Sequence, residues 1–561
     1  MFFILKIMEK EAEIAALNAI LQQLKLPAMR KEYRLLYLLA LLKLALPFLI
    51  QNPAYEPHRD EFLYLIEGRH MAWGFMEVPP LLSVFAWLTN LFGGGFFWIK
   101  FWPSLFGALT YVLVGRIIIA FGGKWFALVL GVLPFIVGAY LRLFFLFQPN
   151  CPEVFFWTLM AYGLVRHVQS GSNRGLYVAG VALGLGMMSK YSVSFYAVSL
   201  LAGLLLTKQR RVLLNPHFYY ALIVGLAIFL PNLIWQYEHG FPVVYHMKEL
   251  ERTQLQYVSP GRFLLDQVVM NAPVCFVWIA GLIWVGFARE GRRYRFIGWA
   301  TVFVLVILLA GHGKNYYALG AYPILFAFGA LALERQAVGK LTYLRYVWLA
   351  VPLGLGVIYV AIALPFLPPR ELAAHYAKTG MARAAGALRW EDLKDHPLPQ
   401  DFSDMLSWKE MTQKVAKGYA MLDSTEKKQT LLFCDNYGEA GAVNYYGPRY
   451  QLPAAYSDNA SFLYWLPDSF YVYNNLLLVT DDRDEMKHAF IHEFASATLV
   501  DSITTPLARE YGSLIILFKG PSETFRNAFR AKIEKSKYKT TAEGAGKRVG
   551  PNPLERGGTL H

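Results

Sequence analysis

Apolar stretches close to twenty residues long recur along the first two thirds of this 561-residue chain. A helix needs about twenty apolar residues to cross the hydrocarbon core of a bilayer. Leu, Val, Ile and Phe fill these stretches without alternation, so helices, rather than the strands of a barrel, would satisfy the backbone in lipid. The chain is 55% hydrophobic and 17% charged, which excludes an ordinary soluble enzyme. We therefore predict a polytopic α-helical membrane protein.

The apolar pattern predicts about eleven spans, with boundaries that follow hydropathy alone. These are residues 33–50, 98–120, 125–143, 153–166, 176–188, 192–207, 217–236, 267–287, 296–311, 318–333 and 344–366. Lys and Arg gather in alternate loops, such as 208–211 and 289–295, which predicts that those loops face the cytoplasm. Residues 1–32 are then expected to form a cytoplasmic N-terminal helix, and residues 33–366 the membrane domain.

The sequence changes character after the last span. Residues 367–520 mix polar helical stretches with the short apolar runs "TLLF", "NNLLLV" and "SLIILF", which predicts a soluble α/β domain. An odd number of spans places this domain outside the cytoplasm. Residues 521–561 are rich in Lys, Arg, Gly and Pro, and are expected to form a flexible basic tail.

The formal net charge of +14 needs no nucleic-acid partner, because cytoplasmic loops and a basic tail account for it. The three cysteines show neither metal-binding spacing nor a disulfide framework. No Gly-rich nucleotide-binding loop lies where it could act, which disfavours a nucleotide donor. The expected partners are the lipid bilayer and a membrane-borne substrate.

Three acidic residues are expected on the outer face. Asp60 and Glu61 open the stretch "RDEFLYLIEGRHMAWGFMEVPPLL", which we interpret as a helix lying in the membrane interface, and Glu153 begins a span in "QPNCPEVFFW". Helix capping would explain one of these carboxylates. Two acids on one face could instead supply a general base with an orienting partner, or hold a divalent cation.

Isolated cations share that face. Arg142, Lys190 and Lys314 interrupt apolar surroundings at the outer ends of spans. A single Lys there often only extends to the lipid headgroups. Together these three residues could hold a phosphate or pyrophosphate. The aromatic Tyr316 and Tyr317, and His58 and Arg59 beside Asp60, are candidate ligands of a sugar or acceptor, although tyrosines also form ordinary interfacial belts.

At this point the motifs resemble a known family. The segment "RDEFLYLIEGRHMAWGFMEVPPLLSVFAWLTNLFG", followed by "FQPNCPEVFFW", "FLPNLIWQYEHGFP" and "GKNYYALGAYPILFAFGA", resembles the GT-C glycosyltransferases of the family 39 type. That family includes protein O-mannosyltransferases and the aminoarabinose transferases that modify lipid A. The segment "DNYGEAGAVNYYGPRYQLPAAYSDNASFLYW" is similar to the outer domain of the bacterial members.

The resemblance implies a fold, an activity and roles for individual residues. It implies an inverting transfer of a sugar from a polyprenyl-phosphate carrier to a lipid, glycan or protein hydroxyl, outside the cytoplasmic membrane. Asp60 matches the family's catalytic acid and Glu153 the position of its second outer acid. The aminoarabinose enzymes carry Lys where this chain has Val78, so phosphate contacts would come from Lys190, Lys314, or residues such as Lys248 and Arg252.

Two other classes of protein stay open at this stage. A lipid or glycan flippase would also use intramembrane charges, but should place them near the middle of its spans. A membrane-anchored binding protein would not require outer acids and bases to come together. Transfer or release of the lipid carrier distinguishes an enzyme from both.

Overall fold

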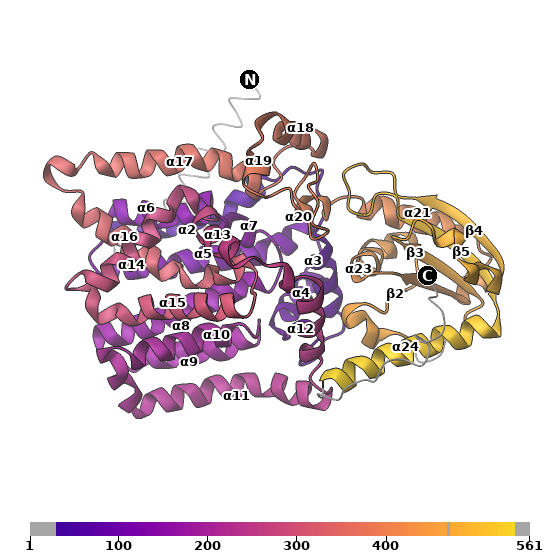
Figure 1. Cartoon of the computed structure of the whole chain (residues 1–561), viewed down its shortest axis with the longest axis horizontal. Helices are drawn as coiled ribbons and strands as arrows, with labels where there is room; N and C mark the ends of the chain where they lie inside the picture. The colour runs from indigo at the N-terminus through magenta and orange to yellow at the C-terminus, as the bar shows by residue number, and fades with distance from the viewer. Residues whose placement is uncertain (1–29, 468–471, 545–561) are drawn as a thin grey trace, which may run out of the picture.

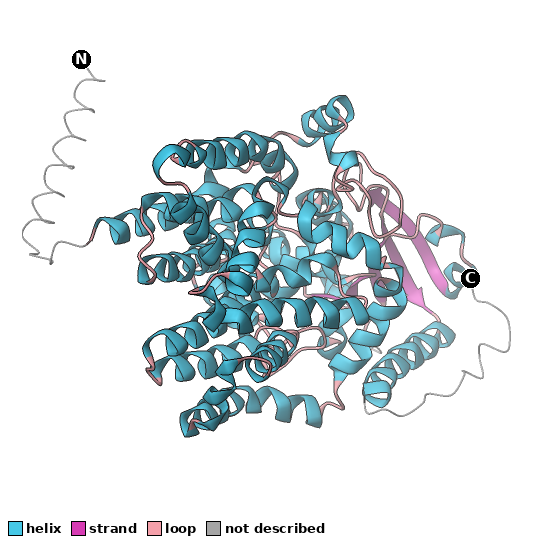
Figure 2. Ribbon diagram, turned by 60° about the vertical axis from the view of Figure 1, so that its left-hand side comes forward, coloured by secondary structure: helices cyan, strands magenta, loops and turns pink. Residues whose placement is uncertain are grey.

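The computed structural model describes residues 30–467 and 472–544. A bundle of helices forms most of the molecule, and a domain containing a sheet caps one end of it (Figure 1). Figure 2 shows that the strands are confined to that end. The helix predicted within residues 1–32 lies almost entirely outside the described residues.

Each of the eleven predicted segments coincides with one helix or with two or three consecutive helices. The bundle consists of α2 (Lys31–Ile50), α5 (Phe96–Ala120), α6 (Trp125–Val137), α7 (Tyr140–Leu143), α8 (Asn150–Ser170), α9 (Arg174–Met187), α10 (Val193–Leu205), α11 (Pro216–Glu238), α13 (Pro260–Val269), α14 (Cys275–Phe287), α15 (Arg295–Ala310), η5 (Asn315–Ala321), α16 (Pro323–Gln336) and α17 (Leu344–Ala363). The short helices η1 (Lys208–Leu214), η4 (Gly291–Tyr294) and η6 (Gly339–Leu341) form turns between them.

Three predicted spans are interrupted in the structure. The helix expected over 125–143 breaks at Gly138, whose backbone is extended. The 267–287 segment bends by 61° between α13 and α14, across a turn that contains Pro273. The 318–333 segment bends by 59° before Pro323, the first residue of α16. Proline lacks a backbone N–H donor, which explains why the breaks in the second and third segments occur at these positions.

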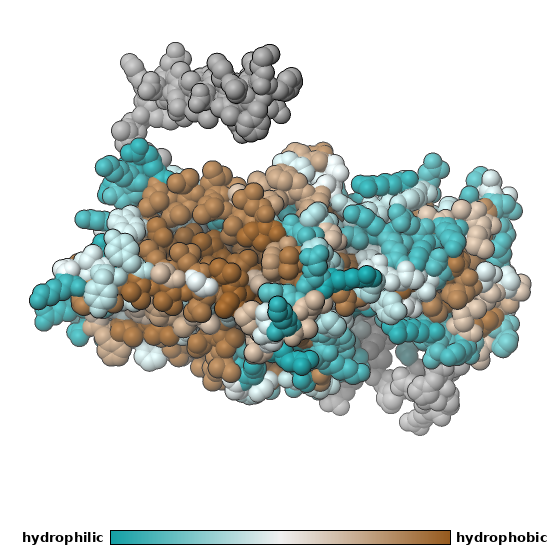
Figure 3. Space-filling view, turned by 90° about the horizontal axis from the view of Figure 1, so that it is seen from above, coloured by the Kyte–Doolittle hydropathy of each residue, from teal (hydrophilic) through white to brown (hydrophobic). Residues whose placement is uncertain are grey.

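The surface of the bundle is that of a membrane protein. An apolar surface covers it in Figure 3, with polar surface at its far end and over the C-terminal domain. By length and apolarity, five described helices can cross a membrane, or up to seven if each bent pair is one span. Membrane character is therefore confirmed, whereas the number eleven stays a prediction.

Glycines allow the closest approach of two bundle helices, α14 and α16. A Cβ on Gly281 would lie 2.1 Å from the carbonyl oxygen of Leu325, whereas a Cβ on Gly286 of the same helix would meet nothing within 4 Å. Small residues permit such backbone contact between helices in lipid. We expect Gly281→Ala to lower the free energy of unfolding by about 1–3 kcal/mol, and Gly286→Ala to leave it unchanged. Unfolding of both variants in detergent measures this, and equal stabilities would contradict the packing.

The helix expected at the membrane interface is instead buried within the protein. Helix α3 (Arg59–Glu67) packs between α4 (Leu81–Leu91) and α23 (Tyr437–Tyr446) of the C-terminal domain, and its residues from Glu61 onward are buried. The prediction of a lipid-facing helix was wrong, because the apolar side chains of α3 pack on a domain far along the chain.

The C-terminal domain has a five-stranded sheet in the order β2-β1-β3-β5-β4. Its strands are β1 (Thr430–Cys434), β2 (Ala455–Tyr456), β3 (Asn475–Thr480), β4 (Phe494–Ser502) and β5 (Leu514–Pro521). Strands β2, β1 and β3 are parallel, and β3, β5 and β4 pair antiparallel. Helix α21 (Trp408–Ala420) packs on β3, β4 and β5, and α23 on β1 and β2. The three apolar runs predicted as strands are β1, β3 and β5.

The segment expected to be a flexible tail begins as a helix. Helix α24 (Glu523–Gly544) runs along the C-terminal domain and packs on α12 (Pro242–Thr253) (Figure 1). Phe525, Phe529 and Ile533 recur every four residues and contribute to the apolar core of that domain. The prediction of a disordered tail from residue 521 was wrong, because high charge concealed this apolar stripe. Residues 545–561 lie outside the described residues.

Candidate active site

Asp60 lies at the N-terminal turn of α3, but its side chain does not cap the helix. His58 is the cap: its Nδ1 accepts from the Asp60 N–H at 3.1 Å, and Glu61 Oε2 accepts from the His58 N–H at 2.8 Å. This reciprocal arrangement is a capping box. The Asp60 carboxylate is thereby left free to interact away from the helix.

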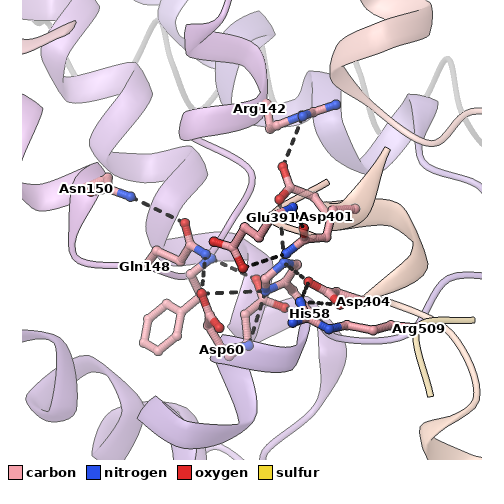
Figure 4. A network of polar contacts seen from close by, with 12 residues as sticks. His58, Asp60, Arg142, Gln148, Asn150, Glu391, Asp401, Asp404 and Arg509 are labelled. Carbon is pink, nitrogen blue, oxygen red and sulfur yellow. Dashed lines mark hydrogen bonds and ion pairs between the residues drawn. The ribbon is translucent and has the colours of Figure 1, made fainter. Parts of the chain in front are cut away.

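Two side chains from distant segments hold the Asp60 carboxylate. Gln148 Nε2 donates to Oδ2 at 2.8 Å (Figure 4), and the Tyr437 hydroxyl donates to Oδ1 at 2.7 Å. A carboxylate offers about four lone-pair directions. These two bonds therefore fix the orientation of Asp60 and leave room for a substrate hydroxyl.

Glu61 points the other way, into the protein. Lys100 Nζ lies 2.6 and 2.7 Å from its two carboxylate oxygens, and the Phe147 N–H donates to Oε1 at 2.7 Å. Glu61 and Lys100 are both fully buried. A helix cap and a buried ion pair account for these contacts, so the arrangement gives no support to the catalytic role predicted for Glu61.

A continuous series of hydrogen bonds joins Asp60 to Glu153. Asn150 Nδ2 donates to Gln148 Oε1 at 3.3 Å, and Lys190 Nζ donates to Asn150 Oδ1 at 2.6 Å and to Glu153 Oε2 at 3.0 Å. We call Asp60, Gln148, Asn150, Lys190 and Glu153 the polar cluster. It brings together α3, the start of α8, and the turn between α9 and α10. The two acids and Lys190, which were predicted to meet, therefore do so.

Glu153 and Lys190 are held tightly within this cluster. Glu153 is buried at the first turn of α8, where the helix dipole favours a negative charge, and it also accepts from the Ser192 hydroxyl. Lys190 Nζ lies 4.1 Å from the ring centroid of Tyr317, a cation–π contact. The rings of Tyr316 and Tyr317 pack edge to face, with their centroids 4.9 Å apart. Both predicted tyrosines thus lie beside the polar cluster.

Two other predicted cations are paired with acids of the segment that leads into the C-terminal domain. Arg142 pairs with Asp401 (Figure 4), with Nη1 3.0 Å from Oδ2, and also donates to the Ile362 carbonyl. Lys314 lies 3.3 Å from Glu391. These pairs tie that segment to the helical bundle.

Three carboxylates surround His58. Its Nε2 lies 3.8 Å from Asp401 and 3.6 Å from Asp404, and Asp404 also pairs with Arg509 at 3.3 Å (Figure 4). Burial opposes a charge on His58, but the nearby carboxylates of Asp401, Asp60 and Asp404 raise its pKa to about 9. Burial likewise opposes the charge on Asp401, yet Arg142 and His58 outweigh it and lower the pKa of Asp401.

Four predicted ligands remain, two of them beside Asp60 and two on α12. Arg59 stacks on the Tyr437 ring at 4.8 Å, so it and the buried His58 join α3 to the C-terminal domain rather than presenting a surface to a sugar. Lys248 and Arg252 lie on α12, where Arg252 pairs with Glu249 at 2.6 Å and the helix packs on α24. The structure does not bring these last two into the polar cluster.

A divalent cation between Asp60 and Glu153 stays a prediction. Within the described ranges, the one group of three residues spaced to share a metal is Asp482, Glu485 and His488, which follows β3 in the C-terminal domain. His488 Nε2 is already bonded to Asp482 at 2.8 Å, and the Asp482 side chain is exposed. None of these three residues belongs to the polar cluster.

Several residues of the site were not predicted. Gln148 and Asn150 stand within the quoted motif "QPNCPE", so polar residues just before a membrane helix were an available signal. Tyr437 is separated from Asp60 by 377 positions, and nothing in its local sequence points to that contact.

A bundle of apolar helices, a cluster of acids and a lysine at its end, and a sheet domain above them form the arrangement expected from the resemblance to GT-C glycosyltransferases. Residues 77–235 match the family model described as dolichyl-phosphate-mannose-protein mannosyltransferase. The chain is 24% identical over 283 residues to the lipid A galacturonosyltransferase RgtD of Rhizobium johnstonii, which is 47% of this chain and 58% of that protein. The match thus spans less than two thirds of the relative.

Solved structures share the fold over nearly the whole chain. ArnT from Cupriavidus metallidurans bound to undecaprenyl phosphate aligns with a TM-score of 0.57 at 13% identity, covering 87% of this chain and 98% of ArnT. Its apo form aligns with a TM-score of 0.58 at 12% identity, covering 87% and 97%. The ArnT-like fold and the resemblance expected from the sequence are confirmed.

Proposed function

We propose that this protein is an inverting glycosyltransferase that moves a sugar from a polyprenyl-phosphate carrier to an acceptor hydroxyl. The observation that carries the proposal is the polar cluster, in which Asp60 and Glu153 lie in one hydrogen-bonded network with Lys190. The dolichyl phosphate in the description of the family model and the undecaprenyl phosphate bound by ArnT support this class of donor, and the relative RgtD, a lipid A galacturonosyltransferase, supports a lipid acceptor. A lipid A-like glycolipid is the first acceptor to test.

In the proposed reaction Asp60 is the general base. It takes the proton of the acceptor hydroxyl as that oxygen bonds to the anomeric carbon, while the bond from that carbon to the phosphate oxygen breaks. Polyprenyl phosphate leaves from the opposite face, which inverts the configuration. The bonds from Gln148 and Tyr437 hold the carboxylate in place for this single displacement.

Lys190 is the best-placed cation for the leaving phosphate. An ammonium group has three N–H donors, and in the described part of the chain Asn150 and Glu153 accept two of them. The third can reach a phosphate oxygen and stabilise the charge that returns to it. Arg142 and Lys314 could add to this only after parting from Asp401 and Glu391.

We place the site and the C-terminal domain outside the cytoplasm. The basic loops gather at the other end of the bundle, where Arg293 donates to the Val168 carbonyl and Arg335 to the Phe121 carbonyl. Loops rich in Lys and Arg face the cytoplasm, which supports this orientation in a cytoplasmic membrane. A flippase is disfavoured because the acids and lysine lie at helix ends, not at mid-span.

A reconstituted assay tests the proposal. Purified protein in liposomes receives undecaprenyl-phosphate-linked sugars, beginning with galacturonate, and lipid A as acceptor. We expect labelled sugar on lipid A and an equimolar release of undecaprenyl phosphate. Lys190→Met should slow transfer at least tenfold, whereas Lys248→Met, on a helix outside the cluster, should not. Recovery of every donor intact, or its movement across the membrane without cleavage, would contradict the proposal.

A further inference from the structure

We infer that Tyr437 of the C-terminal domain is a positioning residue for the base Asp60, so that this domain completes the active site rather than only covering it. This inference rests on the proposed function. Its central observation is the 2.7 Å hydrogen bond from the Tyr437 hydroxyl to Asp60 Oδ1, between residues 377 positions apart.

The local structure of α23 fixes where Tyr437 lies. Tyr437 is the first residue of this helix, and Asn436 caps it by accepting from the Gly438 and Glu439 N–H groups at 2.9 and 3.1 Å. Glu439 Oε2 accepts from the Asn436 N–H at 3.4 Å, which completes a capping box. The hydroxyl is therefore presented from a rigid helix end.

Helix α23 also packs unusually close to α3, which carries Asp60. A Cβ on Gly438 would lie 2.4 Å from Arg59 Cγ, and a Cβ on Gly441 would lie 2.8 Å from Phe62 Cβ. The two glycines are three residues apart and so face the same side of the helix. Arg59 of α3 also stacks on the ring of Tyr437 of α23, which adds a second contact between the two helices.

The chemistry of the bond suits positioning and not proton transfer. Burial and the neighbouring Asp60 carboxylate raise the pKa of Tyr437 well above its usual range, so the phenol keeps its proton and donates. A hydrogen bond to an ionised group such as this carboxylate is stronger than one between two neutral groups. Tyr437 donates to Oδ1 and Gln148 donates to Oδ2. Together the two bonds hold the Asp60 carboxylate in one orientation toward the acceptor.

A matched pair of variants tests the inference. Tyr437→Phe removes the hydroxyl bonded to Asp60; Tyr445→Phe, on the same helix, removes one that donates to the Gly94 carbonyl at 2.6 Å. Both are assayed with the undecaprenyl-phosphate sugar that the wild type turns over fastest, and with lipid A. We expect Tyr437→Phe to lower kcat about ten- to hundredfold with little change in KM for either substrate. Tyr445→Phe should keep wild-type kcat.

A double-mutant cycle separates positioning from a general structural effect. If Tyr437 acts through Asp60, then Tyr437→Phe should lower the residual single-turnover rate of Asp60→Asn by less than twofold.

The outcomes are distinct. A wild-type protein that transfers no sugar overturns the proposed function and this inference with it. A wild type that transfers sugar, with Tyr437→Phe equal to Tyr445→Phe, overturns only the inference. Equal losses from Tyr437→Phe in the wild-type and Asp60→Asn backgrounds would reduce Tyr437 to a purely structural residue.

Discussion

Replacing Asp60 by Asn should lower kcat for sugar transfer by about 10²–10⁴-fold. The side chain keeps its size and can still accept from Tyr437, but an amide cannot take the proton of the acceptor hydroxyl. KM for the lipid donor should change little, because Lys190 and Asn150 remain in place. Initial rates with radiolabelled undecaprenyl-phosphate sugar measure the effect.

The control for this variant is Asp392→Asn, which changes an acid paired with His396 in the segment before the C-terminal domain. It should leave kcat unchanged, which would show that removing a carboxylate from this segment is not harmful in itself. Transfer by Asp60→Asn at a near wild-type rate would remove Asp60 from the role of base.

Breaking the buried pair between Lys100 and Glu61 should have the largest effect on stability. Lys100→Met leaves the Glu61 carboxylate fully buried, and among the described residues the backbone N–H groups of His58 and Phe147 are its remaining donors. Removing one partner of a buried ion pair costs about 3–5 kcal/mol, because the other charge is left uncompensated. Denaturant unfolding in detergent, followed by tryptophan fluorescence, measures this loss.

A double variant tests whether the lost stability comes from the unpaired charge of Glu61. The double change Lys100→Met with Glu61→Gln removes both charges, so it should recover much of the lost stability. A Lys100→Met variant within about 1 kcal/mol of the wild type would show that the charge of Glu61 is satisfied without Lys100. A double variant less stable than Lys100→Met would contradict the ion-pair explanation.

The sequence was sufficient to predict elements whose signal is local. Apolar runs of the right length predicted the bundle helices, and short apolar runs predicted β1, β3 and β5. The sorting of charges onto one face predicted that Asp60, Glu153 and Lys190 would meet, because only a common membrane surface explains that sorting. Local signals failed where proline and extended glycine interrupt a helix, as at Gly138 and Pro323.

Features that depend on tertiary contacts could not be predicted this way. The burial of α3, the bond from Tyr437 and the pairing of Arg142 with Asp401 each join segments hundreds of residues apart. The role of Glu61 was partly accessible: a Glu three residues after a cap position fits a capping box, and Lys100 is a charge in an apolar stretch. Their pairing became evident only from the fold.

We propose above all that the donor phosphate binds at the polar cluster beside Lys190. This position brings the anomeric carbon of the sugar close to the acceptor hydroxyl that Asp60 deprotonates. A cryo-electron microscopy structure of the full chain with undecaprenyl phosphate tests this most directly. We predict phosphate density within hydrogen-bonding distance of Lys190 Nζ, between the turn that joins α9 to α10 and the start of α8. Density for the phosphate at another surface, with the polar cluster unchanged, would contradict the account.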